Sequence, residues 1–435
     1  MLMAHFEEDL KIKSVKALEI ADSRGRPTVK VCVSTNLSRE CASAPSGASK
    51  GKHEAIELRD GGNRLKGYGV RRAVLVVEHQ IAPILIGKDI RNQAEIDEAM
   101  KKLDGTPNLS KLGANATIAT SIAVAKTAAS SLGLPLYRYL GGTKPLSTPI
   151  PLMNVINGGA HAGNKLEFQE FLIAPVKAES FTDAFWKGVE VYLSLKEVLE
   201  KRHGKEATLV GDEGGFAPPL EEPGQALETI NTAIENAGFK PGEDFYLGID
   251  VAATQFYDAG KKRYSFLGRE WTAGELMDYY KELVETFPVK SIEDPFYEEH
   301  YKNFAELQRN LRPLGVIIVG DDLYVTNSEL LEKGLENGST LGVIVKPNQV
   351  GTLTDTIKFI EKAKRAGQKI ILSHRSGETE DNYVADLAIA FNSDFIKAGA
   401  PARSDRNSKY NRVLEIDDET GRTLYYKGVE AYKVT

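Results

Sequence analysis

The chain is predicted to be an α/β protein in which a small amino-terminal α+β domain caps a TIM-like barrel of the ββαα(βα)6 type. Three features of its 435 residues predict this fold. Six short apolar runs in the second half of the chain each end in a charged or titratable residue. The segments between these runs show helical periodicity, and the stretch before the barrel is rich in glycine and proline. The expected boundaries are 1–140 for the capping domain, 141–149 for a linker and 150–435 for the barrel.

The clearest of the six runs is 341–345, which contains three β-branched residues and leads directly into Lys346. It is typical of a short buried strand with a charge at its carboxyl end. The residues that end the other five runs are Asp250, Glu293, Asp321, His374 and Lys397. Segments between the runs, such as 301–311 and 352–366, have helical periodicity. A right-handed strand–helix series closes naturally into a barrel, and the chemistry of such barrels lies at the carboxyl ends of the strands.

The capping domain is expected to begin with a β-hairpin or meander and to continue with helices. Residues 13–37 alternate apolar and polar residues on both sides of a turn at 22–27. Helical spacing of apolar residues then predicts three helices, over 71–85, 92–103 and 114–132. The loop 46–54 contains small residues, two glycines and two lysines, and it is flexible enough to fold over an anion. It lacks the pattern of a nucleotide-binding phosphate loop, so taken alone it indicates a surface loop.

The barrel is expected to open with two strands followed by two helices. These are predicted at 150–156, 168–175, 181–201 and 223–237. Two glycine-rich loops lie between these predicted elements. The loop 157–164 contains His161 and is a candidate lid, and the loop 209–218 contains Glu213. Glu170 stands within an apolar run, where an unpaired carboxylate is costly. Together with the six later runs, this part of the chain predicts eight strands.

Composition narrows the class of protein. The net charge is −6 and no basic stripe is present, which argues against generic nucleic-acid binding. No apolar run approaches the length of a membrane helix, and the amino terminus does not resemble a signal peptide. The two cysteines, Cys32 and Cys41, have no metal-like spacing. The absence of a disulfide framework suits a reducing compartment, so a cytoplasmic protein is expected.

The strand ends predict a metal site and an anion site at one barrel mouth. Asp250, Glu293 and Asp321 place three carboxylates together, which implies a divalent cation, and oxygen-only ligands favour Mg²⁺. Lys346, Arg375 and Lys397 would face an anionic substrate from the other side. A cation opposite a lysine suits removal of a proton from a carbon next to a carboxylate, with the pKa of the lysine lowered by nearby positive charge. Glu170 and Glu213 remain as candidate acids for a leaving group.

Nine short motifs, in order along nearly the whole chain, resemble those of the enolase family. They are Ala21-Asp22-Ser23-Arg24-Gly25, Ser46-Gly47-Ala48-Ser49, Asn157-Gly158-Gly159-Ala160-His161-Ala162, Phe168-Gln169-Glu170-Phe171, Gly211-Asp212-Glu213-Gly214-Gly215, Glu293-Asp294-Pro295, Gly320-Asp321-Asp322, Val345-Lys346-Pro347-Asn348-Gln349 and Ser373-His374-Arg375-Ser376-Gly377-Glu378-Thr379. The family interconverts 2-phosphoglycerate and phosphoenolpyruvate with two Mg²⁺ ions, the second of which arrives with the substrate.

The resemblance implies a role for each site residue. Asp250, Glu293 and Asp321 resemble the ligands of the first ion, and Ser46 resembles the loop residue that closes onto the second. Lys346 resembles the base that removes the C2 proton. Glu213, backed by Glu170, resembles the acid that helps the C3 hydroxyl leave. The residues implied in substrate binding are His161, Glu170, Glu293, Asp321, His374, Arg375, Ser376 and Lys397.

The resemblance also implies a homodimer, or possibly an octamer. Three positions depart from the family pattern, namely Arg26, Lys50 and Pro347, and the residues before Lys13 have no counterpart. One alternative is a sister enzyme of the superfamily that acts on a sugar acid or muconate, but such enzymes lack the Ser46 loop, the His161 lid and the 373–379 motif. The other alternative is a non-enzymatic scaffold or binding role, which missing catalytic groups would favour; all of them are present.

Overall fold

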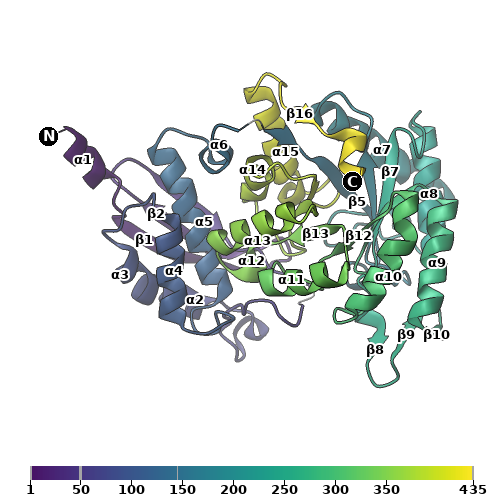
Figure 1. Ribbon diagram of the computed structural model, residues 1–435, viewed down its shortest axis with the longest axis horizontal. Helices are drawn as coiled ribbons and strands as arrows, with labels where there is room; N and C mark the ends of the chain where they lie inside the picture. The colour runs from purple at the N-terminus through teal and green to yellow at the C-terminus, as the bar shows by residue number, and fades with distance from the viewer. Residues whose placement is uncertain (1, 49–50, 145, 434–435) are drawn as a thin grey trace.

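The computed structural model describes residues 2–48, 51–144 and 146–433. A capping domain of a three-stranded sheet and helices lies at one end of the molecule, and a closed eight-stranded barrel surrounded by helices forms the rest (Figure 1). The predicted α/β fold, with its cap and its barrel, is confirmed. Among the described residues, no helix is both long and apolar enough to cross a membrane.

The sheet of the capping domain contains one strand more than the predicted hairpin. Strands β1 (Ser14–Ala21) and β2 (Pro27–Ser34) pair antiparallel around the predicted turn, and β3 (Arg39–Ser43) adds to the other edge of β2. Cys32 and Cys41 are directly opposed on β2 and β3 and form a disulfide. The expectation of a chain without disulfides was therefore wrong, because the unpredicted third strand brings the two cysteines together.

The helices of the capping domain include the three predicted segments, one of them interrupted, and two short helices, at 2–9 and 136–141, that were not predicted. The helices are α1 (Leu2–Asp9), α2 (Arg71–Val76), α3 (Ala82–Leu85), α4 (Gln93–Asp104), α5 (Ala114–Ser131) and α6 (Leu136–Gly141). The helix predicted over 71–85 is divided by a π-helical turn at Val77–Ile81. Pro83 follows directly, and because proline cannot donate a backbone hydrogen bond to the preceding turn, it favours such an interruption.

The barrel contains the eight predicted strands. They are β5 (Ile150–Asn157), β6 (Glu170–Pro175), β7 (Phe245–Asp250), β11 (Val289–Glu293), β12 (Ile317–Gly320), β13 (Gly342–Val345), β14 (Lys369–Ser373) and β15 (Phe395–Lys397). Strand β6 runs antiparallel to both neighbours, and the other neighbouring strands are parallel. This orientation follows from the connection between β5 and β6, which contains only a short 3₁₀ turn and no crossover helix.

The helices around the barrel also match the predicted series. They are α7 (Phe181–His203), α8 (Pro223–Asn236), α9 (Ala273–Thr286), α10 (Tyr301–Leu311), α11 (Ser328–Asn337), α12 (Pro347–Val350), α13 (Leu353–Arg365), α14 (Tyr383–Ala390) and α15 (Ser404–Glu419). The long interval before β11 contains an unpredicted antiparallel sheet of β8 (Tyr257–Asp258), β9 (Arg263–Phe266) and β10 (Arg269–Trp271). The expected linker contains β4 (Ser147–Thr148), which pairs with β16 (Tyr425–Tyr426) near the carboxyl end.

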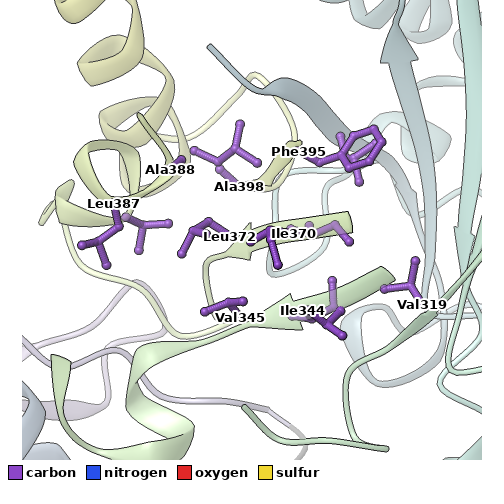
Figure 2. Packing of buried hydrophobic residues seen from close by; sticks show 14 of the residues in the cluster. Val319, Ile344, Val345, Ile370, Leu372, Leu387, Ala388, Phe395 and Ala398 are labelled. Carbon is purple, nitrogen blue, oxygen red and sulfur yellow. The ribbon is translucent and has the colours of Figure 1, made fainter. Parts of the chain in front are cut away.

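The barrel core is a continuous layer of aliphatic side chains. Val319, Ile344 and Leu372 come from three successive strands and are at most 4% exposed (Figure 2). Burial of such side chains contributes roughly 1.5–3 kcal/mol each. This packing holds the strands in register, so that their carboxyl ends open at one mouth.

The capping domain contacts the barrel beside the turn that follows Lys346. The Thr117 hydroxyl on α5 donates to the Gly351 carbonyl at 2.8 Å, and Lys101 on α4 pairs with Asp355 on α13 at 2.7 Å. The cap therefore packs against α12 and α13, the two helices that come directly after the predicted base.

Candidate active site

Six parallel strands deliver the predicted site residues to one end of the barrel. Asp250, Glu293 and Lys397 are the last residues of their strands, while Asp321, Lys346 and His374 directly follow theirs. Asp250 and Glu293 are neighbours in the register of β7 and β11. Because all six strands point the same way, a local pattern in the sequence becomes a ring of side chains in space.

Lys397 lies among three buried carboxylates. Its Nζ is 3.0 Å from Asp250, 2.8 Å from both oxygens of Glu293 and 3.1 Å from Glu170. Burial by itself would lower the pKa of Lys397, but these carboxylates, Asp250 first, outweigh it and hold the pKa well above its usual value. The pKa of Glu293 is raised well above its usual value by burial and by Asp250. Lys397 therefore stays charged and offsets the negative charge of this group.

Lys346 is paired with the third predicted ligand, Asp321. Its ammonium group contacts the Asp321 carboxylate closely, and Gln349 donates to the other carboxylate oxygen at 3.2 Å. Burial would lower the pKa of Lys346, but Asp321 outweighs burial, so the pKa is raised. The sequence-based expectation of a lowered pKa is therefore wrong for this state of the site, because it considered only the neighbouring cations and not this carboxylate.

The donor set at the mouth fits a divalent cation. The three predicted ligands are divided between two lysines, since Lys397 binds Asp250 and Glu293 while Lys346 binds Asp321. Among the described residues, the cluster of close carboxylate oxygens at this place comes from Asp294, Asp321 and Asp322, so it contains Asp321 but neither Asp250 nor Glu293. Burial and then the charge of Asp321 raise the pKa of Asp322 to about 8. Each of these carboxylates is either paired with a lysine or has a raised pKa. Carboxylate oxygens are the hard ligands that a divalent cation prefers.

A second cluster consists of His161, Glu170 and Glu213. The Nδ1 atom of His161 lies 3.6 Å from a carboxylate oxygen of each glutamate, and all three side chains are buried. Burial and the charge of Glu213 raise the pKa of Glu170 well above its usual value. Burial would also raise the pKa of Glu213, but the imidazoles of His161 and His374 outweigh burial and hold that pKa well below its usual value. The pKa values of the two glutamates are therefore shifted in opposite directions, and Glu170 is the stronger base of the pair.

His374 is held in one tautomer by a residue that sequence reasoning missed. Arg406 on α15 is fully buried and donates to Nδ1 of His374 at 2.6 Å, while the opposite ring nitrogen, Nε2, lies 3.3 Å from Glu213. Burial lowers the pKa of His374 to about 3, although the nearby Glu213 carboxylate opposes this. Because Nδ1 must accept from Arg406, the proton of the neutral ring lies on Nε2 and faces Glu213.

Arg375 is buried and paired with a residue of the capping domain. Its two terminal nitrogens bind both oxygens of Glu54 at 3.0 and 3.1 Å, and Asn348 accepts a further hydrogen bond at 3.1 Å. The pKa of Arg375 is raised, since Glu54 outweighs the effect of burial. Such a two-point contact matches the fork that arginine uses for phosphates and carboxylates.

The loop with Ser46 is docked against the predicted phosphate motif. Ser46 exchanges two backbone hydrogen bonds with Gly377, both at 2.8 Å, and the Ala48 amide donates to the Ser376 hydroxyl at 2.6 Å. The Ser46 hydroxyl itself donates to Glu57 at 3.1 Å, away from the carboxylates of the barrel. Lys50, one of the departures from the family pattern, lies outside the described residues, as does Ser49.

Eight of the predicted side chains line one small cavity, whereas Asp250, Glu293, Asp321 and Ser46 are not among its lining residues. Its volume is only about 20 Å³, which is enough for about one water molecule. The lining includes His161, Glu170, Glu213, Lys346, His374, Arg375, Ser376 and Lys397, with Gly47 and Ala48 from the capping loop. A three-carbon substrate does not fit in this volume, so the loops over the mouth have to move before one can enter.

Sequence reasoning missed several side chains that orient the predicted ones. These are Glu54 and Asn348 beside Arg375, Gln349 beside Asp321, Asn154 beside Glu213, Gln169 beside Asp250 and Arg406 beside His374. Gln169, Asn348 and Gln349 lie within the quoted motifs, so proximity to the base or to Glu170 could have found them. Glu54, Asn154 and Arg406 have no comparable signal, because their partners are distant in the sequence.

Comparison with known proteins agrees with this geometry. The family described as "Enolase, C-terminal TIM barrel domain" matches residues 145–435, and "Enolase, N-terminal domain" matches residues 12–140. The chain is 51% identical to an enolase of Thermococcus kodakarensis, over 97% of this chain and 98% of that protein. It is 51% identical to an enolase of Pyrococcus furiosus (98% and 99% covered) and 49% identical to one of Saccharolobus solfataricus (97% and 98% covered). The chain belongs to the enolase family.

Proposed function

We propose that this protein is a phosphopyruvate hydratase that reversibly dehydrates 2-phosphoglycerate to phosphoenolpyruvate in glycolysis and gluconeogenesis. One observation carries the proposal: a candidate base, two candidate acids and the candidate phosphate ligands all line the same cavity at the barrel mouth. Family membership supports a hydro-lyase that uses a divalent metal and acts on a small molecule.

The anionic ends of the substrate have separate partners. Arg375 and Ser376, with His374 beside them, would bind the phosphate, and Lys397 would contact the carboxylate. Lys397 is suited to this because it stays charged although it is fully buried. Placing the two anions at fixed points orients C2 toward Lys346 and C3 toward the glutamate pair.

Asp250, Glu293 and Asp321 would hold the first Mg²⁺, and Ser46 would close onto the second. When bound, these ions would polarise the substrate carboxylate and stabilise the negative charge that develops as the C2 proton leaves. The support in this structure is the donor set of buried carboxylates at adjacent strand ends. Ser46 would have to exchange its contact with Glu57 for this role.

Lys346 would remove the C2 proton. In the described state, Asp321 keeps Lys346 protonated, so the lysine becomes a base only when Asp321 is engaged elsewhere. Once Asp321 serves as a ligand, Arg375 and Lys397 are left as the charges that lower the pKa of Lys346. Engagement of Asp321 by the metal would thus shift the pKa of Lys346 downward, in the direction that a base requires.

Glu213 would assist loss of the C3 hydroxyl with Glu170 as its proton reserve. The raised pKa of Glu170 supports this role, and His161 is 3.6 Å from both carboxylates. A substrate hydroxyl placed among these three groups would receive the proton as it leaves as water. His161 would at the same time cover the site from the loop 157–164.

Ultraviolet absorbance tests the reaction, because phosphoenolpyruvate has a conjugated double bond and 2-phosphoglycerate does not. A rise in absorbance that requires Mg²⁺ and stops with EDTA is expected. The same assay with sugar acids or muconate in place of 2-phosphoglycerate should show no turnover. A folded protein that binds Mg²⁺ but leaves 2-phosphoglycerate unchanged would overturn the proposal.

We further propose that the chain acts in the cytoplasm as a homodimer, with an octamer as the larger candidate assembly, and that 141–149 links residues 1–140 to the barrel at 150–435. The resemblance to the family supports each of these points. Sedimentation of the purified chain would distinguish dimer from octamer, and a single monomeric species would contradict both.

A further inference from the structure

A large cavity lies at the opposite end of the barrel from the candidate active site. It has a volume of about 900 Å³ and is lined by residues at the start of several strands, including Tyr246 on β7, Lys290 on β11 and Leu341 just before β13. Pockets that bind drug-sized molecules occupy about 300–1,000 Å³. The cavity is therefore large enough for an organic ligand, and nothing in the proposed reaction uses it.

The charged side chains that line this cavity are all cations. They are Lys290, Arg309, Arg312 and Lys433, and no aspartate or glutamate is among the described residues that line it. A neighbouring cavity of about 470 Å³ shares Arg312 and Lys433 and adds Arg365 and Lys369, and its described lining contains no acidic side chain either. In a chain with a net charge of −6, six cations around two adjoining cavities form a local field that favours a multiply charged anion.

Two of these cations, Lys290 and Lys433, have only weak acceptors among the described residues. Lys290 is half-buried and donates to the Leu314 carbonyl at 2.8 Å, and burial lowers its pKa. Lys433 is exposed, and its carboxylate partner, Glu430, is 3.7 Å away and also exposed. Exposed pairs of this kind contribute little. An anionic ligand would supply the strong acceptor that these side chains lack.

The same cavity has an aromatic and apolar wall. The rings of Tyr246 and Tyr432 pack edge to face with centroids 5.2 Å apart, and the Lys290 ammonium lies 5.9 Å from the Tyr246 ring centre. Leu335, Leu341 and Val429 also line the cavity. Inorganic phosphate would need neither this surface nor this volume, whereas a flat heterocyclic base would use both.

We propose that this cavity, termed here the basal cavity (lined by Tyr246, Lys290, Arg309, Arg312, Tyr432 and Lys433), binds a nucleotide. The base packs against Tyr246 and the apolar wall, and the polyphosphate meets the cations at the rim. The site does not depend on the proposed hydratase reaction, since the two sites lie at opposite ends of the barrel.

The test is calorimetric titration of the full chain with ATP in the presence of EDTA, at low and at high salt. The double variant Arg309→Glu/Lys433→Glu is compared with Lys196→Glu/Lys201→Glu, which makes the same charge change at exposed lysines of α7. We expect ATP to bind the native chain and the α7 variant equally, more weakly at high salt, and at least about tenfold more weakly to the Arg309/Lys433 variant. Circular dichroism of each variant checks that it is folded.

A second comparison tests the aromatic part. Inorganic triphosphate should bind more weakly than ATP, and Tyr246→Leu should weaken ATP binding while leaving triphosphate binding unchanged. Equal affinity for triphosphate and ATP would overturn the assignment of a nucleotide. Failure of ATP to bind the native chain, or binding that Arg375→Ala abolishes and Arg309→Glu/Lys433→Glu does not, would overturn the basal cavity as the site.

Discussion

Glu54 of the capping domain and Arg375 of the barrel form a two-point ion pair, with nitrogen–oxygen distances of 3.0 and 3.1 Å. Arg375 is 4% exposed and Glu54 is 9% exposed, so water screens the pair little. The pair crosses the domain boundary at the candidate phosphate site. It therefore couples the position of the cap to the orientation of the arginine that is proposed to hold the substrate.

Replacing Glu54 is expected to affect both stability and substrate binding. Glu54→Ala removes the carboxylate that contacts the buried Arg375 guanidinium at two points, which should cost about 3–5 kcal/mol of unfolding free energy. Because the guanidinium loses its orientation, the KM for 2-phosphoglycerate should rise about tenfold, by analogy with a lost charge-assisted contact. Thermal unfolding and steady-state kinetics measure the two effects. Glu200→Ala, at an exposed position of α7, is the matched control. A fall in the KM of Glu54→Ala would show instead that Glu54 competes with the phosphate for Arg375.

Lys346→Ala is expected to abolish exchange of the C2 proton of 2-phosphoglycerate with solvent. The variant lacks the group that accepts the proton but retains Asp250, Glu293 and Asp321, so Mg²⁺ binding should remain nearly intact. Nuclear magnetic resonance in deuterated water follows the exchange, and calorimetry follows the metal. Exchange at the native rate in a folded variant would remove Lys346 from the role of base.

Stability is expected to fall on acidification in a way that depends on His374. Its pKa is lowered from 6.5 to about 3 in the folded chain, so below pH 6.5 the unfolded chain binds the additional proton. As the pH falls from 7 to 5, this histidine should therefore lower the unfolding free energy by about 2 kcal/mol. Above pH 7 it should have little effect on the unfolding free energy.

Urea unfolding of the native chain and of His374→Asn at both pH values, in EDTA, isolates this effect. Glu170 and Glu293 act in the opposite direction, because their raised pKa values stabilise the fold as the pH falls. Both glutamates are present in the native chain and in the His374→Asn variant. The difference between the two proteins in how their unfolding free energy changes with pH therefore reports the contribution of His374. Parallel slopes would mean that His374 is protonated in the folded chain near its usual pKa.

Removal of a metal ligand is expected to remove the stabilisation that Mg²⁺ provides. At a free Mg²⁺ concentration 100 times its Kd, binding should stabilise the native chain by about 2.7 kcal/mol. Glu293→Gln should abolish most of this increment and the hydratase activity, while Glu306→Gln, at an exposed position of α10, should retain both. Calorimetric melting with Mg²⁺ and with EDTA measures the increment. Equal increments in the two variants would exclude Glu293 as a ligand.

The sequence by itself determined the barrel and the residues at its mouth. Strand and helix patterns are local, and a parallel strand series brings every strand end to the same side, so Asp250, Glu293, Asp321, Lys346, His374 and Lys397 could be grouped without coordinates. The family motifs then assigned each residue a candidate role. Local patterns did not reveal β3 or the small sheet at 257–271, because short strands at domain edges leave weak signals.

Only the tertiary structure decided how these side chains pair. It joined Glu54 to Arg375 across 321 residues and Arg406 to His374 across 32, and it divided the carboxylates between Lys346 and Lys397. It also brought Cys32 and Cys41 together and placed cations around the basal cavity at the far end of the barrel. The physical reason is that ion pairs and pKa values depend on distances of a few ångströms between remote segments, and packing of the whole chain sets those distances.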